Sequence, residues 1–594
     1  MPNLASWFRI LTSCRWNIAI PIALIPLLIG CPSRPQPTRN STSHTDQEDA
    51  LAAVRDTVRK EHKADTFKTA VAQLNVYLGR PTDAKPAIAS PSERDLLANK
   101  LHLSADELKE VLREDFSPLD VHYLDECFLF HDAARGLKLD FAQKSDAAQL
   151  ERGRLCFAWA MRQVWLNDKP SRPLPPSYAL RMGFGNLAER TGVALAILQV
   201  IGIDAGVVGI AKDRTTLEPW CLAMRIGNEI YLLDPRGGKP VPGEGGKGIA
   251  TLRQVRKNPA LAQAYVQANV SNNDVASTVA NSKVWLSPPL SSLSPRMRWL
   301  QSVLPVNPPV ALGADVLSDI DEFAKAGETI DFWNPEGDIT TMTRRLSDFV
   351  RQSDGGFEPN PPGQRLIDSY LSSLVPFAQM PALLRGNVVT GDPANRLRGI
   401  FSQRFLKYQL EVDQPRDQVL RGHFDDANRA LVELLSEIKT VQRHIAGETD
   451  LDQGALKWAE DWRHAASQVE RLKRDKRSEQ EIHEATSRVA ALEKAADKMM
   501  LVIERSASEP FAGMITFQLA LCKHEQAERV ARTRRDEADV IRDAWQNSAG
   551  WWRNYLGRFG TAGWIQPGQI NHAKKLLAEV ESEIAKLPAA KSNP

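Results

Sequence analysis

The fold class of this chain is decided by two stretches: GFGNLAERTGVALAILQVIGIDAGVVGI, residues 183–210, and EPWCLAMRIGNEIYLLDP, residues 218–235. Apolar residues recur at helical spacing over 187–201 and a glycine ends the run, which predicts a helix. The β-branched residues of 205–211 predict a strand, and the apolar runs on either side of Gly227-Asn228 predict a β-hairpin. Helix, strand and hairpin in this order predict an α+β fold.

The same elements resemble the transglutaminase-like core, a papain-related fold. The resemblance is carried by the turn Gly185-Asn186, the helix end Gly202-Ile203, Trp220 in the first strand of the hairpin, and the pair Asp234-Pro235 at the end of the hairpin. In that family the turn places a nucleophilic cysteine at a helix N-terminus, one strand brings a histidine and the next brings an aspartate. The resemblance covers residues 150–255 and implies such a fold and site here.

The chain departs from this family pattern at two of the three catalytic positions. The cysteine position falls on Leu187, and the histidine position falls on Glu218 or, one residue further on, Pro219; Asp234 alone matches. No histidine occurs between residues 131 and 423. A reactive thiolate at a helix N-terminus needs a neighbouring imidazole, and the aspartate orients that imidazole. The sequence therefore predicts a domain that has lost its cysteine chemistry.

Two relocated sites stay open as alternatives. Cys221 follows Trp220 on the strand expected to carry the histidine, and strand alternation would turn it to the face opposite Trp220, which leaves the cleft open to it. Two of the carboxylates Glu189, Glu218 and Asp234 could instead form a pair for acid–base work. A thiol-directed probe that labelled Cys221 or Cys156 selectively would favour relocated catalysis.

Composition limits the other functional classes. The 594 residues suffice for about three to four domains, and 75 basic against 73 acidic side chains give a net charge of +2, so no single-sign field favours nucleic-acid binding. The six cysteines include no CxxC pair, so no zinc ribbon or disulfide framework is predicted. His122 and His131 lie nine residues apart, on poorly matched helix faces, so we expect no metal site there. No cofactor is predicted.

The N-terminus has the pattern of an export signal. Arg9 and Arg15 precede an apolar run of about 13 residues, which is shorter than the 20 or so that a spanning helix needs. The run ends in Leu28-Ile29-Gly30-Cys31, which resembles a bacterial lipobox with Cys31 as the lipidated residue, although Pro32 departs from the usual pattern. The sequence predicts membrane anchoring through this lipid; an uncleaved anchor or a plain secretory signal are the alternatives.

The remaining chain divides by composition. Ser90 and Ser104 each precede a glutamate by three residues and so predict helix starts with capping boxes. The stretch 236–248 is glycine-rich but lacks the phosphate-loop pattern, so a surface turn is expected. The predicted order starts with a lipoprotein-type signal (1–31) and a tether with a helical segment (32–90). The transglutaminase-like domain with its N-terminal helices follows (91–255), then an irregular mixed segment (256–400) and an α-helical region (401–594).

The C-terminal region shows helical periodicity throughout. Two apolar stripes repeat at spacings of three and four, and they consist of Leu431, Leu434, Ile438, Val441 and Ile445, and of Ile482, Ala485, Val489, Leu492, Ala496, Met499 and Ile503. Further helices are expected over 510–547, either continuous or broken, and over 569–586, and the aromatic residues of 551–556 are placed to lock helices together. The stripes fit either core packing or a partner-binding coiled coil.

Three functional hypotheses follow from these patterns. The first is a non-catalytic, membrane-anchored protein of the bacterial cell envelope, in which the transglutaminase-like domain binds or scaffolds and the C-terminal helices bind a protein partner. The second is an active cysteine-type hydrolase or acyl-transferase with a rearranged site. The third is an envelope spacer that holds something at a fixed distance through its helices.

Overall fold

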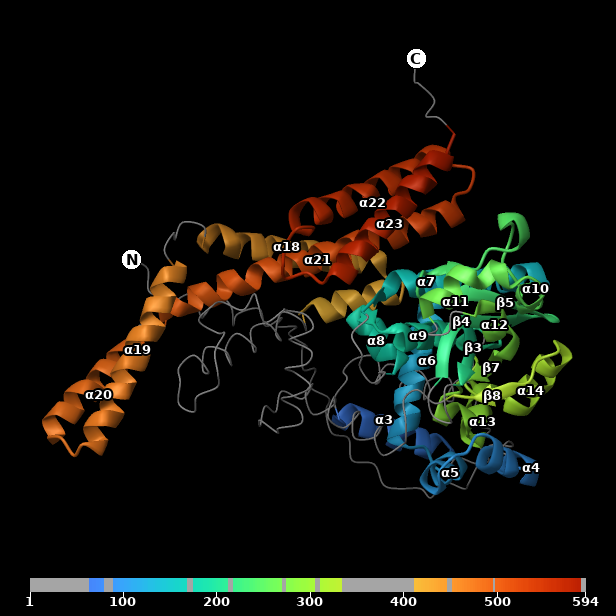
Figure 1. The fold of residues 1–594 in the computed structure, drawn as a ribbon, viewed down its shortest axis with the longest axis horizontal. Helices are drawn as coiled ribbons and strands as arrows, with labels where there is room; N and C mark the ends of the chain where they lie inside the picture. Colours follow the sequence, from blue (N-terminus) through green and yellow to red (C-terminus); the bar gives the residue numbers. More distant parts are fainter. Residues whose placement is uncertain are drawn as a thin grey trace, which may run out of the picture. The chain divides into compact units, whose positions relative to one another are not determined.

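The described part of the chain is a mixed α+β protein (Figure 1). The structure, a computed structural model, describes residues 64–78, 89–167, 175–211, 217–269, 274–304, 310–333, 411–445, 451–494 and 497–588. The expected signal and Cys31 lie outside these residues. Within them, no helix combines the length and the apolar character needed to cross a membrane.

Helices with well-formed starts precede the sheet. Ser90 and Ser104 cap α4 and α5, and each exchanges hydrogen bonds with a glutamate three residues later, as predicted. Ser117 and Asp120 form the same box at the start of α6. The elements up to the sheet are α3 (Ala64–Leu78), α4 (Pro91–Asp95), a π-helical turn (Leu96–Lys100), α5 (Ala105–Leu112), α6 (Pro118–Gly136), α7 (Asp146–Gln163), β1 (Trp165–Leu166), α8 (Pro176–Met182), β2 (Phe184–Gly185) and α9 (Leu187–Val200).

The main sheet has six strands in the order β6-β5-β4-β3-β7-β8. Neighbouring strands run antiparallel, except that β8 is parallel to β7. The strands are β3 (Ala205–Ala211), β4 (Leu217–Ile226), β5 (Glu229–Asp234), β6 (Lys239–Pro240), β7 (Lys283–Leu286) and β8 (Ile330–Phe332). The predicted strand 205–211 and the hairpin around Gly227-Asn228 are therefore confirmed, and the expected mixed segment 256–400 contributes two strands to the same sheet.

Helices cover both faces of this sheet. On one face, Leu222, Met224 and Leu233 pack in a core shared with α6, α7 and α9. On the other face, Cys221 and Ala223 pack against the helices that follow the sheet's first strands. These later helices are α10 (Leu252–Lys257), α11 (Gln263–Asn269), α12 (Val275–Asn281) and α14 (Val316–Lys325), whereas α13 (Pro295–Val303) packs in the core of the first face.

The described residues after 410 are helical, as predicted. A helical stretch over 411–420 is followed by α18 (Phe424–Ile445), α19 (Leu451–Arg474), α20 (Glu479–Lys494), α21 (Asp497–Thr533), α22 (Ala538–Phe559) and α23 (Pro567–Lys586). Leu431 and Ile438 of the first predicted stripe are buried in a core with α21 and α22, and Leu434 and Val441 pack partly buried against it, so this part of the stripe serves core packing. Leu435, outside the predicted stripe, is buried in the same core. The aromatic segment 551–556 lies within α22, where Trp552 and Tyr555 are fully buried.

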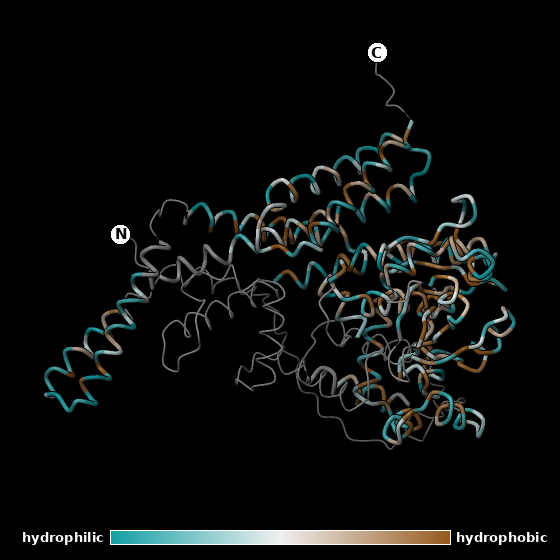
Figure 2. Tube along the Cα trace, viewed as in Figure 1, coloured by the Kyte–Doolittle hydropathy of each residue, from teal (hydrophilic) through white to brown (hydrophobic). Residues whose placement is uncertain are grey.

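α19 and α20 form a hairpin (Figure 1). Trp458 packs inside it and donates its indole N–H to the carbonyl of Leu492 at 2.8 Å. Only Trp458, Ala465, Val469 and Ala485 are buried among its described side chains, and Figure 2 shows hydrophilic residues predominating along it. The second predicted stripe thus lines this hairpin over Ile482–Leu492, while the side chains of Ala496, Met499 and Ile503 lie outside the described set.

Candidate functional site

The turn before α9 has the geometry that the sequence predicts. Gly183 ends α8 in the left-handed region with φ +78°, and Phe184-Gly185 pairs with Trp165-Leu166 in a short parallel ladder. Asn186 caps α9: its side chain accepts from the Glu189 amide at 3.0 Å, and Glu189 accepts from the Asn186 amide at 2.7 Å. Because this capping box aligns the first turn, residue 187 stands at the N-terminus of the helix.

Leu187 occupies that first helical position and is half-buried. Its carbonyl accepts a hydrogen bond from the Thr191 hydroxyl at 2.7 Å. The helix N-terminus would favour a thiolate here through its macrodipole, but the side chain present is a hydrocarbon. The position expected for the nucleophile therefore has the backbone geometry of such a site, but its side chain has no nucleophilic group.

Cys221 does not take over that role, because it lies on the wrong face of the sheet. Strand β4 carries a bulge: Val208 pairs with Cys221 and Gly209 pairs with Pro219, so Trp220 is an extra residue. Trp220 and Cys221 consequently share the core on the face away from α9. The prediction that alternation turns Cys221 to the face opposite Trp220 is wrong for this reason.

The surroundings of Cys221 also suppress its reactivity. The thiol is 1% exposed and donates a hydrogen bond to the carbonyl of Leu233 at 2.9 Å. Burial raises the pKa of Cys221 well above its usual value, and the nearby negative charge of Asp234 raises it further. Since only the thiolate is nucleophilic, the thiol is inert at neutral pH.

Asp234 ends β5 and closes the turn that follows. Its two carboxylate oxygens accept the backbone N–H groups of Arg236 at 2.9 Å and Gly237 at 2.8 Å. Burial raises the pKa of this carboxyl, and the two amide hydrogen bonds act in the opposite direction. The one residue that matches the family triad thus has a clear structural task in the loop 234–238.

Two cations act on Asp234, Lys575 of α23 and Arg190, which lies one helical turn beyond Leu187. Its guanidinium donates to the carbonyls of Pro235 at 2.8 Å, Arg236 at 3.0 Å and Met161 at 2.8 Å. Burial lowers the pKa of Arg190 to about 10, against the opposing effect of Asp234. A guanidinium remains charged at neutral pH and donates only, so it cannot act as the general base that a histidine would supply.

The carboxylate-pair alternative finds two of its members already engaged. Glu189 completes the capping box and Asp234 holds its turn. Glu218 lies half-buried on β4, opposite Ile210 on β3, and Pro219 follows it at the bulge. Both of the engaged carboxylates accept hydrogen bonds from backbone amides, which favours a structural role for each.

The other described thiols are equally protected. Cys127, Cys156 and Cys522 are fully buried. Burial raises the pKa of Cys156 and of Cys522 to about 12, and burial likewise raises the pKa of Cys127. None of the four described thiols has the partly exposed, electropositive environment that activates cysteine.

The acidic residues near His122 and His131 also have structural partners. Arg181 donates to the Asp125 carboxylate at 2.8 Å, and Glu126 accepts the backbone N–H of Ser177 at 3.0 Å. Across the described ranges, no three His, Cys, Asp or Glu side chains come together in a way that could hold a metal ion. These residues join α6 to α8.

Comparisons with known proteins do not assign this chain to a family. No family model, no curated protein and no solved structure shows significant similarity to the chain. The site must therefore be understood from its own residues. Sequence reasoning missed Arg190, although an arginine in an otherwise apolar helix is a signal that a buried hydrogen-bond acceptor lies near it.

Proposed function

We propose that this chain is a non-catalytic, membrane-anchored protein of the bacterial cell envelope, in which a degenerate transglutaminase-like domain binds or scaffolds. One observation carries the proposal: Leu187 stands at the capped N-terminus of α9, while the fallback thiol on the hairpin, Cys221, is buried on the face of the sheet away from α9. The order of α9, β3, β4 and β5 supports the family resemblance. Without nucleophile and base, binding is the function left to such a domain.

Thiol reactivity tests the loss of catalysis. The native full-length protein is treated with iodoacetamide at pH 8, and labelling is followed cysteine by cysteine by mass spectrometry. We expect no labelling of the four described thiols until urea unfolds the chain, because all are buried with raised pKa values. Fast labelling of Cys221 or Cys156 in the native protein would overturn the proposal in favour of a rearranged enzyme.

Lipid attachment is tested in a bacterial host grown with radiolabelled palmitate. Cys31→Ala is expected to abolish labelling and to release the protein from membranes, since acyl chains on that cysteine would supply the anchor. Cys14→Ala is the matched control, because Cys14 lies in the same segment before the apolar run and should keep both label and membrane location. Equal labelling of the two variants would reject Cys31 as the lipidation site.

The hairpin α19–α20 is the part of the C-terminal region that we propose for partner binding. It buries few of its described side chains, so its surface is accessible. Cross-linking in intact cells, followed by purification, compares the full chain with a variant lacking 451–494. A cross-linked species formed by the full chain and lost from the variant supports this assignment; an unchanged pattern assigns the contact elsewhere.

A further inference from the structure

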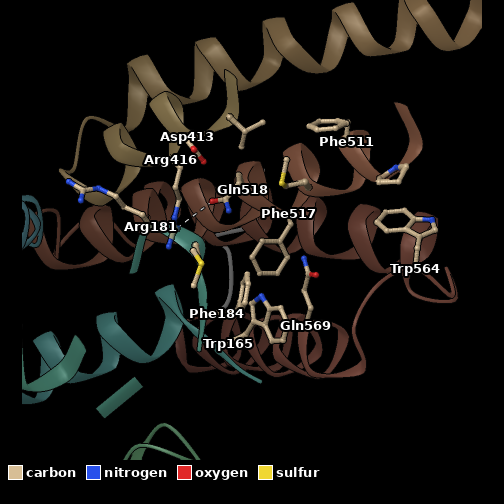
Figure 3. Close-up of a pocket in the computed structure, with 15 residues that line it drawn as sticks. Trp165, Arg181, Phe184, Asp413, Arg416, Phe511, Phe517, Gln518, Trp564 and Gln569 are labelled. Atoms are coloured by element: carbon tan, nitrogen blue, oxygen red, sulfur yellow. Dashed lines mark hydrogen bonds between the residues drawn. The ribbon is translucent and has the colours of Figure 1, made fainter. Parts of the chain in front are cut away.

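A cavity of about 70 Å³ lies where the α+β part meets the C-terminal helices. Figure 3 shows its lining residues, which come from α8, β1 and β2 on one side and from the helical stretch 411–420, α21 and the start of α23 on the other. This cavity contains none of Leu187, Glu218, Cys221 or Asp234. An inference about it therefore stands whether or not the proposed function holds.

Arg416 is the buried charge of this cavity. It is 2% exposed, and its terminal nitrogens donate to the side chain of Gln163 at 2.7 Å, to that of Gln518 at 3.3 Å, and to the backbone carbonyls of Gln163 at 2.9 Å and Leu180 at 3.0 Å. These acceptors are all neutral. Figure 3 shows the guanidinium reaching from the helix toward Gln518.

Three carboxylates, Glu525, Asp413 and Asp417, act on the charge of Arg416 only from a longer range. No carboxylate of the described residues forms an ion pair with it, and its Nε–H has no hydrogen-bond partner among them. Burial lowers the pKa of Arg416 to about 10, so the group is nevertheless charged at neutral pH. A buried guanidinium with a free donor is costly unless an anion or another acceptor satisfies it.

The second arginine of the lining, Arg181, is already neutralised. It donates to Asp125 at 2.8 Å and lies 3.7 Å from Asp417. Among the described lining residues, Asp413 then balances the formal charge of Arg416. What favours an anionic group beside Arg416 is its unsatisfied Nε–H, because a hydrogen bond between two charged groups is stronger than one to a neutral acceptor.

Most of the remaining described lining is apolar, and five of its side chains are aromatic. Trp165 and Phe184 stack with ring centroids 5.1 Å apart, and Phe511, Phe517 and Trp564 come from the helical side. Such walls suit an apolar or aromatic body, because they offer planar contact area that is poorly hydrated. At about 10–15 Å³ for each water position, the volume admits the head of a small ligand or the last residue of a chain.

We propose that this cavity binds a carboxylate group carried on an apolar body, with Arg416 as the recognition residue. The carboxylate accepts the free Nε–H, and the apolar body packs against the aromatic walls. Two sources share this chemistry: a free small acid and the C-terminus of a peptide that ends in an apolar residue.

Calorimetric titration of the full-length protein in detergent tests the proposal. The probe is 3-phenylpropionate, and 3-phenylpropanamide is the uncharged control of the same shape. We expect the acid to bind at least about tenfold more tightly than the amide, since a hydrogen bond to a charged group is lost with the charge. Equal binding of both, or binding of neither, overturns the proposal.

Two variants locate the binding. Arg416→Met removes the cation at similar volume and should reduce acid binding at least about tenfold. Since Arg416→Met also removes four hydrogen bonds and could disturb the fold, a second variant, Gln569→Glu, leaves Arg416 in place. It puts a negative charge on the half-buried opposite wall of the cavity and should weaken binding of the acid but not of the amide. Arg463→Met on the exposed face of α19 is the control and should bind like the unaltered chain. Unchanged acid binding in Gln569→Glu, with its circular dichroism intact, excludes this cavity.

The two sources are separated with the peptide Ala-Ala-Phe and its C-terminal amide. Tighter binding of the free peptide than of 3-phenylpropionate identifies a peptide C-terminus as the natural ligand class. Binding of the small acid alone identifies a free acid. Binding of the peptide amide as tight as that of the free peptide contradicts the proposal, because Arg416 would then not read the carboxylate.

Discussion

Arg162 and Glu525 form a buried bidentate ion pair across 363 positions of sequence. Nε and Nη2 of the arginine donate to the two carboxylate oxygens at 2.9 and 3.0 Å. Gln163 adds a third donor to the same carboxylate at 2.9 Å. The pair joins α7, which packs under the sheet, to the middle of α21, and both side chains are almost fully buried. It is therefore a fixed point between the α+β part and the C-terminal helices.

Glu525→Gln should destabilise the protein strongly. It leaves the guanidinium of Arg162 buried without its closest counter-charge, for which about 3–5 kcal/mol of unfolding free energy is typical. The urea midpoint of unfolding measures this. Glu151→Gln removes a partner of the exposed pair with Arg154 and should change stability by less than about 1 kcal/mol. Similar midpoints for both variants would mean that the buried pair contributes nothing special.

Gly136→Ala should destabilise, whereas Gly550→Ala should not. A Cβ at Gly136 would lie 2.9 Å from the Cα of Gly422, whose own φ of +78° leaves the turn little freedom to move. Overpacking of this kind costs about 1–3 kcal/mol. Gly550 is exposed within α22 with open space around its Cβ position, so alanine should add about 0.5–1 kcal/mol through helix propensity. Thermal unfolding of the two variants checks the opposite signs.

Stability should fall as the pH drops below about 6.5, through His524 and His572. Burial, with Arg162 near the first and Arg190 near the second, lowers the pKa of His524 to about 4 and that of His572 to about 3. The unfolded chain therefore takes up protons before the folded one, so the stabilisation present above pH 6.5 is lost toward pH 4–3, at about 1.4 kcal/mol per pH unit for each histidine.

Urea midpoints from pH 7.5 to pH 4.5 measure this dependence. His572→Gln should flatten the slope, and the exposed His483→Gln should leave it unchanged. A slope that is identical in all three proteins would contradict the assignment.

Asp319→Asn should stabilise the protein at pH 8 and have little effect at pH 4. Burial, together with the charges of Asp204 and Asp315, raises the pKa of Asp319 to about 7. The folded state therefore holds this proton longer than the unfolded one, and stability is lost as the pH rises from about 4 through 7. Asp321→Asn, at an exposed position of the same helix, is the control. A stabilisation of equal size at both pH values would rule out this linkage.

Local signals account for what the sequence predicts well. The capping boxes at Ser90 and Ser104, the helix from Leu187 and the hairpin around Gly227 depend on residues within a few positions of one another. The bulge at Trp220 depends on the pairing of β4 with β3, so alternation alone placed Cys221 on the wrong face.

The cavity around Arg416 lay beyond sequence reasoning for a related reason. Its lining joins residues near 165–184 to residues near 412–416 and 510–569, which no spacing rule connects. The contacts of Arg190 with the carbonyls of Pro235 and Met161 are equally remote in sequence. The composition of α9 did show that Arg190 directly follows the capping residue Glu189 at the start of a largely apolar helix, but it did not show the partners of Arg190.

The hydrogen bonds that Asp234 accepts from the amides of Arg236 and Gly237 carry a lesson for motif searches. An acid at the end of a hairpin strand can be required by the loop that follows it, whether or not an imidazole lies beside it. A motif search that counts such a residue as evidence for a catalytic site mistakes a structural role for a catalytic one. If cysteine and histidine were substituted at Leu187 and Glu218, the carboxylate of Asp234 would still be engaged by the two backbone amides of its loop and would not be free to orient the new imidazole.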